Sequence, residues 1–338
     1  MATIIKGVDL SYWEVLSWVD PTFDYGWCWE YIDEPTLGFG KKIVAVRGGG
    51  GSEMYVYDVL SDSGFTWFRS APWGVSSGAA LMYCPLNKEL YLLRGGGYAD
   101  FAKLSLSTFS WTTLTSAPWT IGSNNTTTGP NISAVHPCKA IASVPTINYT
   151  DTGGTARTTD HYIFVIRGSG YSDFALYDIT NNVWGVRASL PWTTNRGSLI
   201  WAPEWNSGKI ICIRHESTRD WAVYDIATNT WTSYTYGGGV VGSITASTAS
   251  PVYSKGYGGH LIIFPSRVSD AVYSSGALDI VNNIFIHGIV PRYWGDSSVR
   301  YPRKNTLLIV INNVPYIYHY AGYDRKATFA RCPLYNLL

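Results

Sequence analysis

One pattern of residues recurs four times along this chain and restricts its fold more than any other feature. An apolar stretch ends in Arg, a Gly-rich segment follows, and an aromatic stretch then ends in Tyr-Asp ahead of a Trp. The copies begin at Arg47, Arg94, Arg167 and Arg214, and their closing tryptophans are Trp67, Trp111, Trp184 and Trp231. The copy at Arg94 has Ser105 in place of Asp. Repetition at a regular spacing indicates an array of similar supersecondary units.

The spacing extends this array to six units. Arg47 and Arg94 are 47 residues apart, as are Arg167 and Arg214, and apolar stretches further along the chain continue the series. We expect second strands near 43–47, 90–94, 162–167, 209–214, 260–264 and 306–311. A proline ahead of each stretch gives an independent count of six: Pro35, Pro85, Pro137, Pro203, Pro251 and Pro302.

Each unit is predicted to contain four short strands. Gly, Asn, Ser and Asp separate the apolar stretches, and none of these stretches has the periodicity of an amphipathic helix. Four-stranded units repeated around an axis are typical of a β-propeller, in which neighbouring blades cover both faces of each sheet. The sequence therefore predicts an all-β fold, a six-bladed β-propeller of four-stranded antiparallel blades.

The expected organisation is one domain with a short N-terminal extension. Residues 27–338 form the single propeller, and the Thr-, Asn- and Gly-rich stretch 138–160 is predicted to be an inserted loop. Residues 1–26 are expected to pack on or close the last blade, because pairing strands from the two termini removes a free sheet edge. The C-terminal stretch 327–332 is an alternative candidate for that position.

Composition excludes several classes of function. The chain has 25 basic and 24 acidic residues, so it lacks the positive field that nucleic acid or an anionic membrane surface requires. Its apolar runs are too short to span a bilayer, and its start does not resemble a secretory signal. The five cysteines are scattered without a Cys-x-x-Cys pair, and we expect them to be reduced and mostly buried. No metal site or cofactor is predicted.

The repeat resembles that of a known family of propellers. Double glycine after an apolar strand, then an aromatic residue, Tyr-Asp and a Trp six residues later resembles the kelch repeat and its relatives in galactose-oxidase-type propellers. The resemblance covers roughly residues 27–333. It implies the fold and leaves the function open, because kelch-like propellers include enzymes, adaptors and structural proteins.

One face of the predicted propeller collects the candidate binding residues. In a blade of antiparallel strands, the turn after the second strand lies on the same face as the link to the next blade. This face is expected to carry Arg47, Arg94, Arg167 and Arg214, together with Trp73, Trp119, Trp192 and Trp294. Tryptophan stacks on sugars or partner side chains, and Arg supplies paired donors for carboxylates.

These arginines also have a purely structural interpretation. Acids recur six residues after Arg (Glu53, Asp173 and Asp220) and eleven residues after it (Asp58, Asp178 and Asp225). A repeated Arg–acid bond that joins one blade to the next would explain both without a ligand.

Two enzymatic alternatives have partial motifs. Tyr318-His319 resembles part of the copper site of galactose oxidase, but no second His follows it. Residues Asp62 to Trp67 resemble the Asp-box turn of sialidases, a family that grips a carboxylate with three arginines. Only one degraded copy is present, and we assign no catalytic residue.

We expect a non-catalytic structural or protein-interaction module. Low charge with abundant Gly, Ser, Thr, Asn, Tyr and Trp resembles a bacteriophage virion component, such as a tail, nozzle or capsid-surface protein. Its expected partners are other protein subunits, either virion proteins or the members of a symmetric assembly, and, as a further option, surface glycans. Nucleic acid and membrane insertion are not expected. The alternative function is a carbohydrate-binding or sialidase-like glycosidase propeller, and the alternative locations are the cytoplasm or the exterior without a signal peptide.

Overall fold

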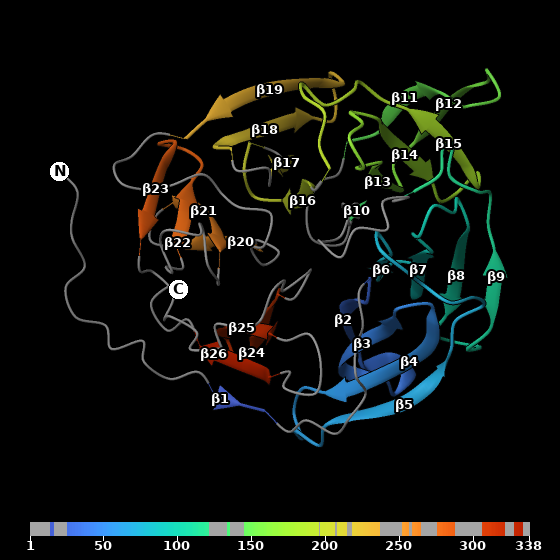
Figure 1. Ribbon diagram of the computed structural model, residues 1–338, viewed down its shortest axis with the longest axis vertical. Coiled ribbons are helices and arrows are strands. Elements are labelled where there is room, and N and C mark those ends of the chain that lie inside the picture. Colours follow the sequence, from blue (N-terminus) through green and yellow to red (C-terminus); the bar gives the residue numbers. More distant parts are fainter. Residues whose placement is uncertain are drawn as a thin grey trace.

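Figure 1 shows the computed structural model of the chain. It describes residues 14–16, 26–121, 134–135, 145–195, 197–206, 208–214, 218–236, 252–256, 259–264, 276–287, 306–321 and 328–333. Within these residues the secondary structure is β-strand, apart from one turn of 3-10 helix at Pro35–Leu37. No helix in the described part of the chain is long and apolar enough to cross a bilayer.

The described strands form six four-stranded antiparallel sheets and one two-stranded sheet. The first sheet contains β2 (Cys28–Glu34), β3 (Gly40–Gly48), β4 (Gly51–Asp58) and β5 (Phe65–Ser70), and the second contains β6 (Ala80–Cys84), β7 (Glu89–Leu93), β8 (Phe101–Ser105) and β9 (Trp111–Thr113). The third contains β10 (Ala134–Val135), β13 (Tyr162–Ile166), β14 (Phe174–Asp178) and β15 (Val183–Val186). The fourth contains β16 (Gly197–Ala202), β17 (Lys209–Arg214), β18 (Asp220–Asp225) and β19 (Thr230–Thr235). The fifth contains β20 (Val252–Gly256), β21 (Gly259–Phe264), β22 (Gly276–Asp279) and β23 (Ile284–His287), and the sixth contains β24 (Thr306–Ile311), β25 (Val314–Ala321), β26 (Thr328–Pro333) and β1 (Glu14–Val15).

The sheets lie around a central axis, each with one strand near the centre and one at the rim (Figure 1). The inner strands are β2, β6, β10, β16, β20 and β24, and each contacts the inner strand of the sheet on either side. The contact of β24 with β2 closes the ring. The architecture is therefore all-β and propeller-like.

The last sheet differs from the sequence prediction. Residues 306–311 were expected to be a second strand, but β24 is the innermost strand of its sheet, and β25 is the second. Asn312 and Asn313, both with positive φ, make a two-residue hairpin turn between the two strands. An inner strand covered on both faces is as continuously apolar as a second strand, so hydrophobicity alone did not separate them.

The N-terminal strand β1 is the outermost strand of this same sheet. Glu14 and Val15 pair with Arg331 and Ala330 of β26, and Nε of Arg331 donates to Oε2 of Glu14 at 2.6 Å. Leu16, only 3% exposed, joins the apolar cluster between the sixth and first sheets. Strands from the two ends of the chain thus complete one sheet.

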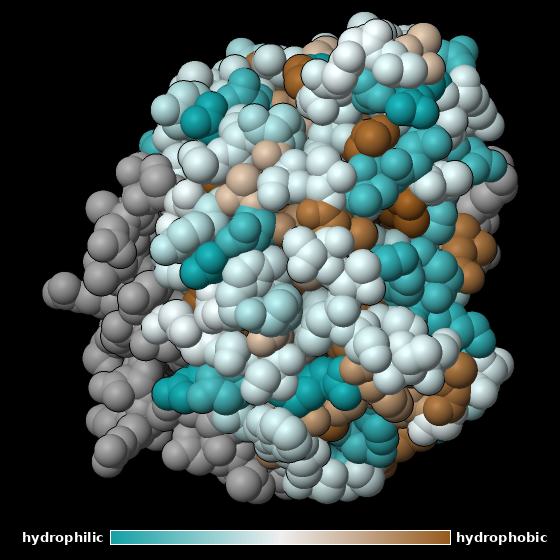
Figure 2. Space-filling model, turned by 90° about the vertical axis from the view of Figure 1, so that its right-hand side faces the viewer, coloured by the Kyte–Doolittle hydropathy of each residue, from teal (hydrophilic) through white to brown (hydrophobic). Residues whose placement is uncertain are grey.

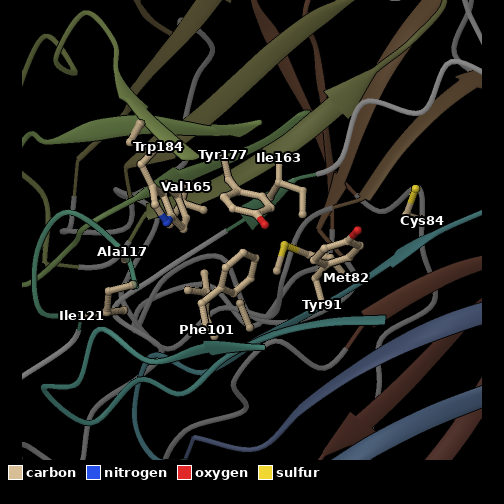
Figure 3. Close-up of a cluster of buried hydrophobic side chains, with 13 residues drawn as sticks. Met82, Cys84, Tyr91, Phe101, Ala117, Ile121, Ile163, Val165, Tyr177 and Trp184 are labelled. Carbon is tan, nitrogen blue, oxygen red and sulfur yellow. The ribbon is translucent and has the colours of Figure 1, made fainter. Parts of the chain in front are cut away.

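Buried aromatic side chains fill the space between neighbouring sheets (Figure 3). Between the second and third sheets, Phe101 packs edge-on against Tyr177 with ring centroids 4.7 Å apart, and Trp184 lies 5.1 Å from Tyr177. The cluster of Phe174, Tyr224 and Trp231 repeats this arrangement between the third and fourth sheets.

The Tyr-Asp pair forms a turn that recurs in the described sheets. One carboxylate oxygen of Asp58, Asp178 and Asp225 accepts the backbone N–H groups two and three residues further on, and Asp279, which follows Leu278 instead of Tyr, does the same. The fourth residue after Asp has positive φ, a conformation that Asn tolerates. In two sheets this residue is Asn182 or Asn229, and it accepts the hydroxyl of the preceding Tyr.

The same turn joins one sheet to the next. The indole N–H groups of Trp111, Trp184 and Trp231 donate to the carbonyls of Ser70, Thr115 and Ala188, each at the end of the previous sheet, at 2.8–3.0 Å. The amides of Thr115 and Ala188 donate in turn to Asn182 and Asn229. Trp and Asn therefore supply hydrogen bonds between neighbouring sheets, in addition to the packing of the buried aromatic rings.

The Trp of the first copy was assigned incorrectly. Phe65 pairs with Tyr57 in the register in which Trp184 pairs with Tyr177. Phe65 is 3% exposed and fills the tryptophan's place in the core, whereas Trp67 is 63% exposed. The sequence spacing between Asp and Trp suggested Trp67, but only the register of the strands shows which aromatic residue opposes Tyr57.

The insertion at 138–160 was predicted to be a loop, but its described part contains a β-hairpin. Strands β11 (Ile147–Thr150) and β12 (Ala156–Thr159) pair in register. Alternation along β11 explains the strand, because Ile147 and Tyr149 are buried while their neighbours are exposed. Asp151 organises the turn by accepting the N–H groups of Gly153 and Thr155. Residues 138–144 lie outside the described part.

We predict that Asn182→Ala lowers the free energy of unfolding by about 1–3 kcal/mol, because it leaves the buried Tyr177 hydroxyl without an acceptor and puts a strained residue at positive φ. Asn181→Ala is the matched control in the same turn, since the hydrogen bond described for the Asn181 side chain goes to Asp178 of its own sheet. Urea unfolding of both variants measures the difference. Equal losses would show that Asn182 does not join the second and third sheets.

Candidate functional site

The Gly-rich turns after the second strands lie against the links that leave the same sheets. Gly50 N–H donates to Val75 at 2.8 Å, and corresponding bonds join Gly97 to Ile121 and Gly170 to Thr194. Gly95 has φ of 68°, and a Cβ there would lie 2.4 Å from the backbone of Ala79, so a side chain is excluded. These turns and links together form what we call the arginine face: Arg47, Arg94, Arg167 and Arg214 with Trp73, Trp119 and Trp192.

Each of these arginines pairs with an acid six residues later. The N–O distances are 2.8 Å for Arg47–Glu53, 2.7 Å for Arg94–Asp100, 2.9 Å for Arg167–Asp173 and 3.3 Å for Arg214–Asp220. Both partners belong to one hairpin, so each pair closes a turn within its own sheet. The structural interpretation of the sequence, in which an Arg–acid bond joins one blade to the next, is therefore wrong for these pairs. Asp100 was missed, although its spacing from Arg94 is the same.

The acids eleven residues after Arg lie at the other end of the strands. Asp225 pairs with Lys209 at 2.6 Å, and Asp58 pairs with Lys42. Asp178 accepts the hydroxyl of Tyr149 from the β11–β12 hairpin. None of these three acids has a bond to a repeat arginine among the described contacts, and they serve the Tyr-Asp turns.

Two exposed tyrosines complete the arginine face, and the sequence prediction missed both. The guanidinium carbon of Arg94 lies 3.5 Å from the ring centroid of Tyr98, and that of Arg167 lies 3.6 Å from the ring centroid of Tyr171. The tyrosines are 50% and 46% exposed. The sequence contained a pattern that could have predicted them, because each Tyr follows its Arg by four residues across the Gly-rich turn.

The predicted tryptophans lie partly in the core. Trp73, Trp119 and Trp192 are half-buried against apolar clusters between sheets. Trp119 lies 6.4 Å from Trp184, and Arg214 lies 5.8 Å from the ring centroid of Trp192. Nε of Arg94 donates to the carbonyl of Gly74, next to Trp73. Trp294, the fourth predicted tryptophan, lies outside the described residues.

The residues of the two enzymatic motifs have structural partners. Asp62 has positive φ and accepts the hydroxyl of Tyr57, so it occupies the position of Asn182 in the Tyr-Asp turn. Tyr318 is buried, and its hydroxyl accepts a bond from Arg331. Among the described residues no three His, Cys, Asp or Glu side chains lie close enough to hold a metal ion.

The described cysteines are buried thiols: Cys28, Cys84, Cys212 and Cys332. Burial raises the pKa of Cys332 to about 11 and raises the pKa of Cys212 as well, which keeps both in the unreactive protonated form at neutral pH. Cys138 lies outside the described residues.

Neither a scan against models of protein families nor a search of curated proteins finds a match. Among solved structures, the chain is similar to that of YjhT, with a TM-score of 0.56 and 12% sequence identity over 94% of this chain and 96% of that chain. At this identity the similarity concerns the fold alone. It supports an all-β, propeller-like architecture.

We predict that Glu53 contributes a small pH-dependent stabilisation. A bond from its own backbone N–H, together with Arg47, holds the pKa of Glu53 below its ordinary value of 4.5 despite partial burial. A lowered pKa in the folded state stabilises the fold above about pH 4.5, and this stabilisation is lost as pH falls through the folded-state value.

The measurement is the free energy of unfolding from pH 7 to pH 3 for the native protein and for Glu53→Gln. The native protein should lose up to about 1 kcal/mol more than the variant below pH 4.5, since a pair this exposed is screened by solvent. Parallel curves would show that Glu53 is not stabilised as the ion.

Proposed function

We propose that this chain is a six-bladed, kelch-type β-propeller that works by binding, without catalysis, and that its ligand is a neutral carbohydrate held at the arginine face. The observation that carries this proposal is the repeated stack of Tyr98 on Arg94 and of Tyr171 on Arg167. Two exposed aromatic rings, each beside an Arg–Asp pair, offer the apolar surface and the hydrogen-bonding groups that a sugar ring requires.

The charge of the arginine face favours a neutral ligand. Each of its four arginines is paired with an acid, so every hairpin carries a guanidinium donor and a carboxylate acceptor with no net charge. Sugar hydroxyls use both kinds of group. A carboxylate ligand would have to compete with Asp100 or Asp173 for its arginine, which argues against the three-arginine grip of a sialidase at these positions.

The Arg–acid pairs are also our reason for proposing a binding protein and not an enzyme. A general acid or base requires a carboxyl group that exchanges a proton near neutral pH. Hydrogen bonds from its own backbone N–H and from Arg47 lower the pKa of Glu53, which suits an ionised acceptor and not a general acid.

A second candidate function is assembly with other protein subunits, as in a virion. It is favoured by large apolar side chains on outer strands: Trp67 on β5, Val186 on β15 and Ile284 on β23 are 63%, 65% and 50% exposed. Figure 2 shows that hydrophobic residues on one side of the molecule form separate patches among hydrophilic ones. Separate patches fit several small contacts better than one large interface. Location in a virion stays a proposal from composition.

We predict that the protein binds neutral glycans on an array and that Tyr98→Ala with Tyr171→Ala weakens this binding at least tenfold, because both stacking surfaces are lost. Calorimetry with the best array ligand measures the change, and tenfold corresponds to about 1.4 kcal/mol. Trp67→Ala is the control, since it removes an exposed aromatic ring from an outer strand.

Other outcomes separate the alternatives. Turnover of a fluorogenic sialoside that is abolished by Arg167→Met would replace the binding proposal with a glycosidase. An empty array, together with recovery of the protein in purified virions, would favour the assembly function.

A further inference from the structure

Arg69 at the end of β5 differs from the arginines of the arginine face, because it has no acidic partner among the described residues. Its Nε is buried without a hydrogen-bond partner in the described part of the chain. Its guanidinium carbon lies 5.1 Å from the ring centroid of Phe68 and 5.2 Å from that of Phe109. Phe68 belongs to β5 of the first sheet, and Phe109 lies in the turn between β8 and β9 of the second, so Arg69 lies between these two sheets. Strands β5 and β9 are the outer strands of their sheets (Figure 1).

The repeat shows which partner Arg69 lacks. The carbonyls of Ser70 and Ala188 accept equivalent Trp bonds, so the residues that precede them, Arg69 and Arg187, occupy the same position in the first and third sheets. Nε of Arg187 donates to the hydroxyl of Tyr224 in the next sheet at 2.9 Å. Tyr224 is the tyrosine of a Tyr-Asp pair.

The second sheet has no such hydroxyl. Leu104 pairs with Trp111 in the register in which Tyr224 pairs with Trp231, so Leu104 stands where the tyrosine would be. Phe109, with φ of 55°, replaces the Asn of the turn and is 38% exposed. A bulky residue at positive φ is strained, and a buried donor without an acceptor costs stability.

The first sheet is altered at the same place. Met54 pairs with Arg69 and Tyr55 pairs with Trp67, so Phe68 is the extra residue of a β-bulge. A bulge changes the direction of the side chains beside it and is frequent at binding sites. Thus the bulge at Phe68, the loss of the hydroxyl at Leu104 and the strained Phe109 all occur around one arginine.

We propose that Arg69, Phe68 and Phe109 form a binding site for a small carboxylate ligand that carries an apolar group next to its carboxylate. A carboxylate matches the paired donors of a guanidinium and supplies the acceptor that Tyr224 supplies to Arg187. The exposed part of Phe109 provides a surface for the apolar group. Burial lowers the pKa of Arg69 with no opposing acid, so a bound anion would compensate the desolvation of its charge.

This site is separate from the arginine face, and its proposal does not depend on carbohydrate binding. The two surfaces differ in charge, because the guanidinium of Arg69 is unpaired within the described residues while Arg47, Arg94, Arg167 and Arg214 are paired. An anionic ligand is therefore expected at Arg69 and a neutral one at the arginine face.

The test is calorimetric titration of the full chain with sodium benzoate, and with benzamide as a neutral ligand of the same shape. We expect saturable binding of benzoate, at least tenfold weaker binding of benzamide, and at least tenfold weaker binding of benzoate to Arg69→Gln. Arg219→Gln removes an exposed arginine that directly precedes β18 of the fourth sheet, and this variant should bind benzoate as the native protein does. Absence of saturable binding, or equal affinity in Arg69→Gln, would overturn the proposal.

A second measurement tests whether Arg69 has a structural partner. Arg187→Met should lower the unfolding temperature, because it removes the bond to Tyr224. Arg69→Met should leave the unfolding temperature unchanged or raise it, because it removes a buried donor without an acceptor. A decrease as large as that of Arg187→Met would show that the fold itself holds Arg69, and the site would be withdrawn.

Discussion

Contact between neighbouring sheets is the constraint on which the rest of this structure depends. Apart from the β11–β12 hairpin, which packs on the third sheet, the described strands make no second layer, so the four-stranded sheets bury their apolar faces mainly against the sheets beside them. The large aromatic side chains that fill these spaces carry polar atoms, which must be bonded once water is excluded. Trp184 donates to Thr115, and Tyr177 donates to Asn182, so packing and hydrogen bonding are satisfied by the same turn. The ring must also close, and β1 completes the last sheet beside β26 for this reason.

Because the repeat builds these contacts, recurrence by itself says little about function. The Asp of each Tyr-Asp pair caps a turn, and the arginines of the arginine face close hairpins with their acids. The candidate ligand groups are the parts that this framework leaves at the surface. Tyr98 and Tyr171 are such groups, since their rings are stacked on arginines and about half exposed. Stacking on a paired arginine restricts the orientations of each ring, and such preorganisation lowers the entropy lost when a ligand is bound.

Sequence reasoning recovered those features that follow from local spacing. The stretches 43–47, 90–94, 162–167, 209–214 and 260–264 do form second strands, and the side of the sheets that carries the arginines followed from strand alternation. Sequence reasoning failed where tertiary contacts determine the structure. Strand register, not spacing, places Phe65 opposite Tyr57, and burial of Tyr149 against the third sheet turns a polar insertion into a hairpin. Tyr98 could have been found from its four-residue spacing to Arg94.

Arg69 shows why a site of this kind cannot be read from one segment. Its sequence neighbours look like those of any outer strand, and Arg187 in the equivalent position is a structural residue bonded to Tyr224. The two arginines differ in their partners chiefly because the following sheet has Leu104 where the fourth sheet has Tyr224. A residue 35 positions away thus decides whether the guanidinium is used by the fold or is available to a ligand. In a repeat protein, loss of one partner can create a binding group without any change in the residue that binds. The departures from the repeat are therefore where we expect function to be located.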